Sequence, residues 1–173
     1  MSVIIDGSAG VTTNTGAVYN SIQSATAQAS TSGTSIDFTS IPSWVKRITV
    51  MFNGVSTNGT NNYFIGIGSG SISSSGYVSG ATQTGVSNTT VNSTQGFIIT
   101  GAVGAAQSYS GAITLSTLGS NIWVSAGNIN QNTGVLNVSA GSATLGGVLD
   151  RIRISTAGGT DTFDAGSINI LYE

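Results

Sequence analysis

The residues that carry most enzyme chemistry are scarce in this chain of 173 residues, which contains no histidine and no cysteine. Its charged side chains are four bases and six acids. They are Lys46, Arg47, Arg151, Arg153, Asp6, Asp37, Asp150, Asp161, Asp164 and Glu173. Because His and Cys are the commonest proton carriers, nucleophiles and metal ligands, most catalytic mechanisms lack their residues here. We expect a protein that is not an enzyme and takes no cofactor.

Two short motifs come closest to a ligand site. The run Gly66-Ile-Gly-Ser-Gly70 resembles a phosphate loop, but position 71 is Ser, so a strand running into a turn is the better interpretation. Asp161 and Asp164 lie three apart near Gly158 and Gly159, yet calcium needs six to eight oxygen ligands. We expect the two acids to cap their turn or to pair with the two arginines of the 151–153 segment, and we expect no metal.

Three further kinds of site are disfavoured by the small number of charges. A glycosidase needs two acids across a cleft, and six acids in all make such a pair improbable. A Ser–Lys dyad would have to use Lys46, which lies beside Arg47 with no recognisable motif around it. Four bases cannot track a phosphate backbone. Nucleic acid is therefore not an expected partner.

Aromatic side chains offer another route to binding, because exposed rings on polar loops stack on sugars and grip protein surfaces. Tyr63, Tyr77 and Tyr109 are the candidates for a surface-binding site of this kind. Trp123 is flanked by Ile122 and Val124, so we expect it to be buried. Trp44 follows Pro42 at the start of a predicted strand and is expected in the core or at a subunit interface.

The elements that must position these residues are predicted to be strands, because helix formers are scarce and β-branched residues recur between turn signals. In Val45–Phe52, the side chains of Ile48, Val50 and Phe52 fall on one face and those of Arg47 and Thr49 on the other. Further strands are predicted at 63–67, 96–100, 112–118, 122–126, 135–139, 148–155 and 167–172, with Arg151 and Arg153 sharing one face. Such spacing indicates an antiparallel β-sandwich, and we expect the jelly-roll type.

The N-terminal part has a different pattern. Residues 8–34 are dominated by Ser, Thr, Ala, Gly and Asn, and they bury too little apolar surface to fold alone. We therefore divide the chain into an N-terminal anchor or trimerisation segment at 1–34 and a sandwich domain at 35–173. Val3, Ile4 and Ile5 form a small apolar tip and are the candidate anchor. No apolar run approaches a membrane span, and the first residues do not resemble an export signal.

Two blocks are more specific than composition, namely residues 25–57, which contain Ile36-Asp-Phe-Thr-Ser-Ile-Pro-Ser-Trp44, and residues 149–173, which contain Asp150-Arg-Ile-Arg153. Together they resemble a module of tailed-bacteriophage virion proteins, often the C-terminal part of proteins labelled tail fibre. The resemblance covers about residues 17–173. The opening Met1-Ser-Val-Ile-Ile-Asp6 is similar to fibre segments that attach to the virion or begin a trimeric stalk.

The resemblance implies a homotrimeric, non-catalytic structural protein on the exterior of a phage particle, assembled in the host cytoplasm. It brings no catalytic residues with it. Its favoured role is a fibre-type protein that helps the particle adhere to a host-surface glycan or protein. The alternative is a capsid decoration protein, of the cement or head-fibre kind, that stabilises the phage head. The expected partners are accordingly a baseplate, fibre or major capsid protein, without membrane insertion.

Overall fold

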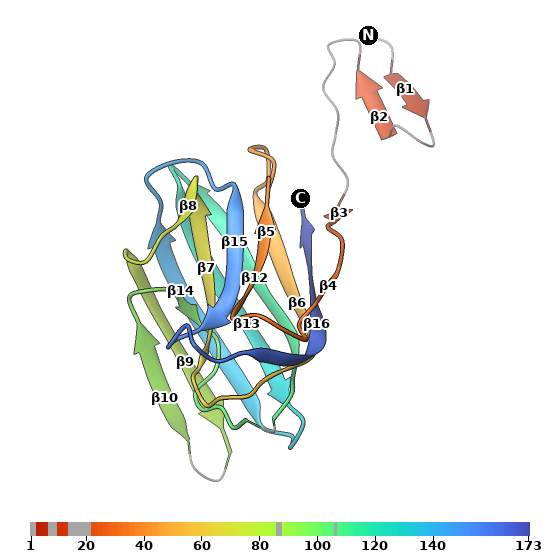
Figure 1. Ribbon diagram of the computed structural model, residues 1–173. Helices are drawn as coiled ribbons and strands as arrows, with labels where there is room; N and C mark the ends of the chain where they lie inside the picture. Colours follow the sequence, from red (N-terminus) through yellow and green to blue (C-terminus); the bar gives the residue numbers. More distant parts are fainter. Residues whose placement is uncertain (1–2, 7–9, 14–21, 86–87, 106) are drawn as a thin grey trace.

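A computed structural model of the chain describes residues 3–6, 10–13, 22–85, 88–105 and 107–173. Regular structure in these residues consists of β-strands, and all paired strands are antiparallel. Two sheets pack face to face in a sandwich (Figure 1). The predicted all-β antiparallel sandwich is confirmed. In the described ranges, no helix has the length and hydropathy to cross a membrane.

The larger sheet has nine strands. In spatial order they are β10 (Thr89–Ser93), β9 (Tyr77–Thr84), β14 (Leu136–Thr144), β13 (Ile122–Gln131), β12 (Tyr109–Gly119), β6 (Arg47–Thr57), β16 (Phe163–Tyr172) and β3 (Gln23–Ser24), and β4 (Gln28–Ala29) also pairs with β16. Strands β12, β13 and β14 follow one another in sequence as a meander, because short turns connect them. Of these strands, β3, β4, β9 and β10 are absent from the sequence prediction.

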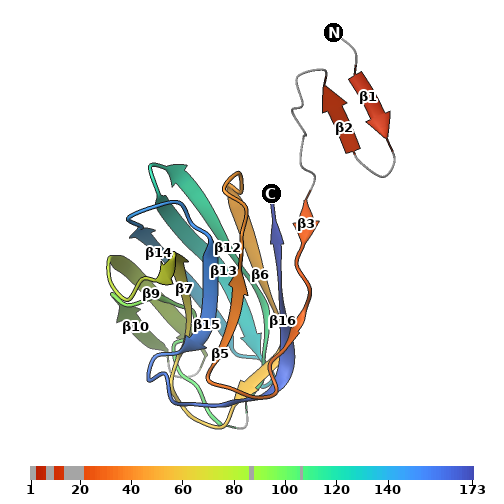
Figure 2. The same ribbon diagram turned by 45° about the horizontal axis from the view of Figure 1, so that its top comes forward.

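The smaller sheet has five strands and covers one face of the larger one (Figure 2). Its order is β11 (Phe97–Ile98), β7 (Tyr63–Ser69), β15 (Arg151–Thr156) and β5 (Ser35–Thr39), and β8 (Ser71–Ile72) pairs with β7. Strand β15 is central and pairs with both β7 and β5. Leu149, which the sequence places out of phase with Ile152 and Ile154, lies before this strand and is buried.

The jelly-roll type, the finer part of the fold prediction, stays a prediction. In an eight-stranded jelly roll, the two sheets read 1-8-3-6 and 2-7-4-5 in chain numbering. The order β5-β15-β7-β11 corresponds to the first of these sheets, and β6, β14, β9 and β10 follow the second. However, β12 and β13 are inserted between β6 and β14, and β16 is added beyond β6. The larger sheet is therefore wider than that of a plain jelly roll.

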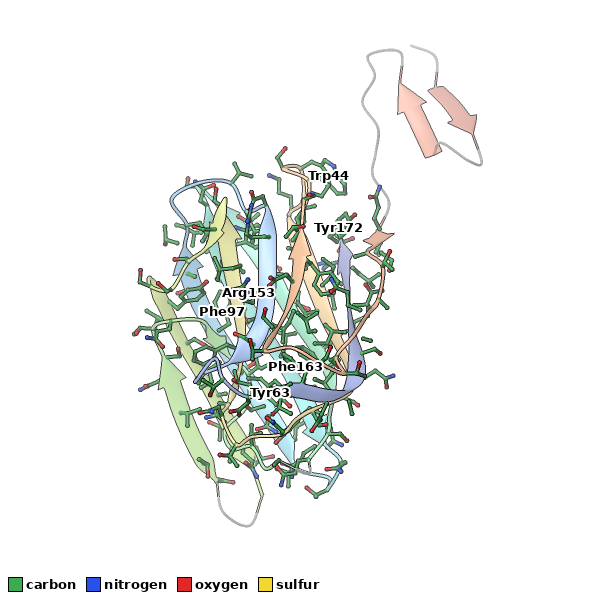
Figure 3. All side chains as sticks on the ribbon, in the orientation of Figure 1. Trp44, Tyr63, Phe97, Arg153, Phe163 and Tyr172 are labelled. Atoms are coloured by element: carbon green, nitrogen blue, oxygen red, sulfur yellow. The ribbon has the colours of Figure 1, made fainter. Side chains whose placement is uncertain are left out.

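The core forms where the inward faces of the two sheets meet, because side chains alternate along each strand. Ile48 and Val50 of β6 are fully buried against the smaller sheet, where Ile152 and Ile154 of β15 are equally buried. The rings of Tyr63 and Phe163 lie close together near one end of this core, 6.1 Å apart between centroids (Figure 3). The ring of Tyr63 also lies 5.2 Å from that of Tyr109. Trp123 is buried, as predicted.

The sandwich begins before the predicted boundary at residue 35. Strands β3 and β4 pair with β16, and the amide of Ser30 donates to the carbonyl oxygen of Gly166 at 3.0 Å. Ser30 is itself fully buried. Residues 23–30 therefore form an edge of the larger sheet. Further towards the N-terminus, β1 (Val3–Asp6) and β2 (Gly10–Thr13) pair only with each other, in a separate two-stranded sheet.

The charged residues are distributed unevenly over the fold. From Ile48 to Leu149 the sequence contains no charged side chain. Strands β7 to β14 all lie within this stretch. Apart from Asp6 in β1, the charged residues therefore lie in or next to β5, β15, β16 and the start of β6.

Candidate functional site

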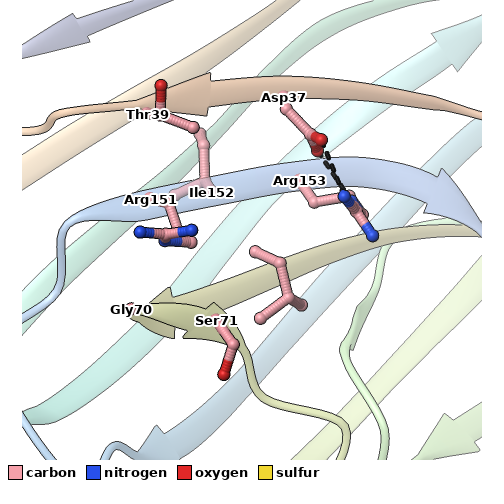
Figure 4. A pocket seen from close by; sticks show the side chains of 8 residues that line it. Asp37, Thr39, Gly70, Ser71, Arg151, Ile152 and Arg153 are labelled. Atoms are coloured by element: carbon pink, nitrogen blue, oxygen red, sulfur yellow. Dashed lines mark hydrogen bonds and ion pairs between the residues drawn. The ribbon is translucent and has the colours of Figure 1, made fainter.

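The outer face of the smaller sheet holds the main cluster of charges. Successive side chains of a strand point to opposite faces of the sheet. Because Ile152 and Ile154 point into the core, Arg151 and Arg153 point outwards. Arg153 is directly opposite Asp37 of β5, and its Nε and Nη2 both donate to the Asp37 carboxylate at 2.7 Å (Figure 4). This hydrogen-bonded partner raises the pKa of Arg153 above its ordinary value. The pair links two strands through their side chains as well as their backbones.

A second ion pair lies at the start of the same strand. Arg151 donates from Nε and Nη2 to the carboxylate of Asp150 at 2.8 and 3.2 Å. The amide of Gly70, in the turn between β7 and β8, donates to the same carboxylate at 3.1 Å. The hydrogen bond from Arg151, helped by this amide, lowers the pKa of Asp150. Asp150 therefore stays ionised and holds the turn against β15.

Between these pairs lies a groove of about 390 Å³. We call it the ion-pair groove; its lining residues are Asp37, Thr39, Gly70, Ser71, Ile72, Arg151, Ile152 and Arg153. Both arginines are matched by carboxylates, so the groove offers polar donors and acceptors with little net charge. Next to it, a second cavity of about 370 Å³ lies beside β5 and also contacts Asp37 and Thr39. Such a surface suits a neutral, hydroxyl-rich ligand better than a strongly charged one.

The remaining described acids are also used by the fold. Arg47 forms an ion pair with Glu173, and Asp164 accepts a hydrogen bond from the Ser56 hydroxyl. Asp161 is nearly buried and accepts from the backbone and side-chain nitrogens of Asn61 at 2.9 and 2.7 Å. The prediction that Asp161 and Asp164 pair with Arg151 or Arg153 is wrong, because those arginines pair with Asp150 and Asp37 instead. Asp161 caps a neighbouring loop instead of its own turn.

The described residues contain neither a cluster of metal ligands nor a phosphate-binding loop at the glycine-rich run. No three His, Cys, Asp or Glu side chains gather there in the way that a metal ion requires. The glycine-rich run 66–70 is a strand followed by a turn, as predicted, with Gly70 at a φ of 72°. A Cβ at Gly68 would lie 2.1 Å from the carbonyl oxygen of Ser71, so this glycine serves the close approach of β8.

The prediction of a surface-binding site at Tyr63, Tyr77 and Tyr109 is wrong. These side chains are 1%, 2% and 1% exposed. Each is the first residue of its strand and is in phase with inward aliphatic neighbours, for example Ile65 and Ile67 after Tyr63. The hydroxyls of Tyr77 and Tyr109 bond inside the protein, to the backbone of Ile67 and to the carbonyl oxygen of Ala102. The alternation of inward and outward side chains along each strand was the sequence signal that could have predicted these rings in the core.

Two other predicted sites are only partly visible. Val3, Ile4 and Ile5 lie in β1, paired with β2, but their side chains fall outside the described residues. Their role as a virion anchor stays a prediction. Trp44 is half-buried, with its ring centroid 5.9 Å from that of Tyr172, at the end of the sandwich where the last strand finishes (Figure 3). It packs at the margin of the core.

Sequence reasoning missed half of the ion-pair groove. It placed Arg151 and Arg153 on one face, but it did not identify Asp37, Thr39, Ser71 or Ile72 as their neighbours. The alternation of buried Ile36 and Phe38 with Asp37 was the available signal for β5.

Comparisons with protein-family models, with curated proteins and with solved structures found no match for this chain.

Proposed function

We propose that this protein is a non-catalytic structural protein on the outside of a bacteriophage particle, of fibre type, that contributes to adhesion to the host surface. One observation carries the non-catalytic part. Of the charged side chains that the structure describes, all except Lys46 hold another part of the fold through an ion pair or a hydrogen bond. Groups committed in this way are poorly placed to act as general acids, bases or nucleophiles.

The phage part of the proposal is supported by the resemblance of residues 25–57 and 149–173 to tailed-phage virion proteins. Those blocks supply β4, β5, the whole of β6, and the two strands β15 and β16. They therefore contain five of the eight residues that line the ion-pair groove. We propose a homotrimer held through the N-terminal segment, docked on a baseplate, fibre or major capsid protein.

Adhesion is proposed to use the ion-pair groove, with a host-surface glycan as ligand. The groove presents guanidinium donors, carboxylate acceptors and the hydroxyls of Ser71 and Thr39 on one exposed sheet face. Paired donors and acceptors of this kind suit the hydroxyls of a sugar. A glycan array with the full chain tests this. Binding should be lost in Arg153→Gln and kept in Arg47→Gln, an equally charged control outside the groove; equal binding by both variants would refute the site.

The location on the particle needs its own experiment. Gold-labelled antibodies against the purified protein should mark the tail of particles produced from the genome that encodes it. Marking of the head would instead support the capsid decoration role, and particles without label would refute the virion assignment. Incubation with bacterial polysaccharides should release no new reducing ends. Any protein-dependent release would refute the non-catalytic part.

A further inference from the structure

The larger sheet has nine strands against five in the smaller one, and its outer side faces away from the core (Figure 2). We call the outward side of β9, β14, β13 and β12 the neutral face. Its middle row is fixed by strand register: Thr114 is opposite Ala126, Ala126 opposite Ala140, and Ala140 opposite Gly80. Val78 beside this row is 75% exposed. The smaller sheet covers the opposite side of these strands, so the neutral face has no packing partner among the residues that the structure describes.

The neutral face carries no charge. None of its four strands contains a charged residue, and neither does β10 at their edge. A protein surface that faces only water usually has charges at about a quarter to a third of its positions. On the next strand, β6, Arg47 is already paired with Glu173. Two copies of this face can therefore approach each other without like-charge repulsion.

The four strands of the neutral face alone span roughly 19 Å by 27 Å, and the outer sides of the adjoining strands β6 and β16 continue the same surface. Strand spacing of about 4.8 Å and a rise of about 3.4 Å per residue give a surface roughly 29 Å by 27 Å when β6 and β16 are included. That is on the order of the 800 Å² that each partner contributes to a standard protein interface. Val138 and Leu136, 46% and 37% exposed, add apolar area to it. Burial of this surface would favour association.

The shape of the middle row suits packing of sheet against sheet. Ala126, Ala140 and Gly80 have side chains no larger than a methyl group, so they leave a low strip between the taller Val78 and Val138. Two sheets pack at about 10 Å when the side chains of one fill the low strips of the other. A contact between identical surfaces must be self-complementary, and a face with both low and raised apolar rows meets this condition.

We propose that the neutral face is where a second copy of this chain docks, with sheet packed against sheet. This contact goes beyond the proposed function, because it is separate from the trimer attributed to the N-terminal segment and does not depend on a location in a virion. An assembly could use both contacts, one through the first residues and one through the sandwich.

Sedimentation velocity of the full chain over a range of concentrations tests the proposal. The wild type should self-associate, and Ala126→Lys should weaken that association at least tenfold, because an unpaired ammonium would be buried in the contact. Ala126 is exposed, so the variant should fold as the wild type does, which circular dichroism can verify. Ala140→Glu is a second variant in the same row, with the opposite charge.

Two controls separate this contact from others. Ala157→Lys makes the same replacement at an exposed turn after β15 and should associate like the wild type. Ile4→Asp changes the N-terminal segment and should leave the neutral-face contact intact. The proposal is refuted if the wild type is monomeric throughout, if both neutral-face variants associate like the wild type, or if only Ile4→Asp abolishes association. Binding of a different virion protein to the neutral face without self-association would also refute it.

Discussion

Arg153 and Asp37 are Cα partners on neighbouring strands, and their side chains meet in a two-point ion pair on the outside of the smaller sheet. The residues are 116 positions apart in sequence. Their side chains are 43% and 38% exposed, so water screens the attraction between them. The pair matches the backbone register of β5 on β15 but adds little to the stability of the fold.

A double-mutant cycle should show this weak coupling. We expect Arg153→Gln and Asp37→Asn to cost little each, with a coupling free energy of about 0.5–1 kcal/mol that falls at high salt. Urea denaturation of the four proteins at low and high ionic strength measures it. A coupling that is several times larger, or that is unchanged by salt, would contradict a solvent-screened pair.

The tyrosine hydroxyls should differ in their effect on stability. Tyr77 accepts a hydrogen bond from the amide of Ile67 at 2.8 Å, so Tyr77→Phe leaves a buried donor unpaired and should cost about 1–3 kcal/mol. The hydroxyl of Tyr63 has no hydrogen-bond partner of ordinary geometry among the described residues, so Tyr63→Phe should cost less than about 1 kcal/mol. Chemical denaturation compares the two variants. Equal losses would contradict the difference in bonding.

Alkaline pH should destabilise the protein through the same rings. Burial raises the pKa of Tyr63 to about 12, and burial also raises the pKa values of Tyr77 and Tyr109. The stability linked to these shifts is complete below pH 10, where both states keep the proton. It is lost as pH rises from about 10 towards 12, by up to about 1.4 kcal/mol per pH unit for each ring, since the unfolded chain releases protons first. Denaturation midpoints across this range, with tyrosinate absorbance, provide the measurement.

Gly127 tests how tightly the larger sheet is packed. A Cβ at this position of β13 would lie 2.5 Å from the carbonyl oxygen of Ala112 and 2.8 Å from Cα of Ile113. Because both are backbone atoms of β12, Gly127→Ala should cost about 2–4 kcal/mol. Gly146→Ala is the matched control, since nothing lies within 4 Å of its Cβ position. Thermal melts of both variants should differ clearly, and similar melting temperatures would count against the close contact.

The carboxylate of Asp161 should control the loop that precedes β7. Asp161→Ala removes two hydrogen bonds to Asn61 and should cost about 2 kcal/mol, because the Asn61 amide loses its partner in a largely buried place. Hydrogen exchange should accelerate at residues 58–62 while β13 keeps its protection. Asp164→Ala is a control at a more exposed acid and should leave exchange at Asn61 unchanged.

The parts of the fold that were predicted are those with strong alternation in sequence. Ile48, Val50 and Phe52 contrast sharply with Arg47 and Thr49, so β6 was found with its correct faces. Strand β9 was missed because its inward residues beyond Tyr77 include Ser79 and Ala81, which contrast little with outward Gly80 and Thr82. A strand that packs through small side chains carries almost no periodic signal.

The site was harder to predict than the fold. Local alternation placed Arg151 and Arg153 on the same face, but the choice of Asp37 as partner depends on which strand lies beside β15, and tertiary structure decides that. The tyrosines were misplaced for a related reason. Each stands next to a polar turn, so its neighbours in sequence suggested exposure, whereas the strand that follows turns the ring inwards.

The short β3 and β4 strands along β16 also have a mechanical consequence. Gln23 is opposite Tyr172, and the contacts continue stepwise from there to Ser30. A pull at Gln23 directed sideways, away from β16, would therefore load these hydrogen bonds one after another. Glu173, by contrast, is held by three backbone hydrogen bonds to Lys46 and Arg47. Under traction, residues 23–30 should peel away first and lengthen the tether while the sandwich stays folded.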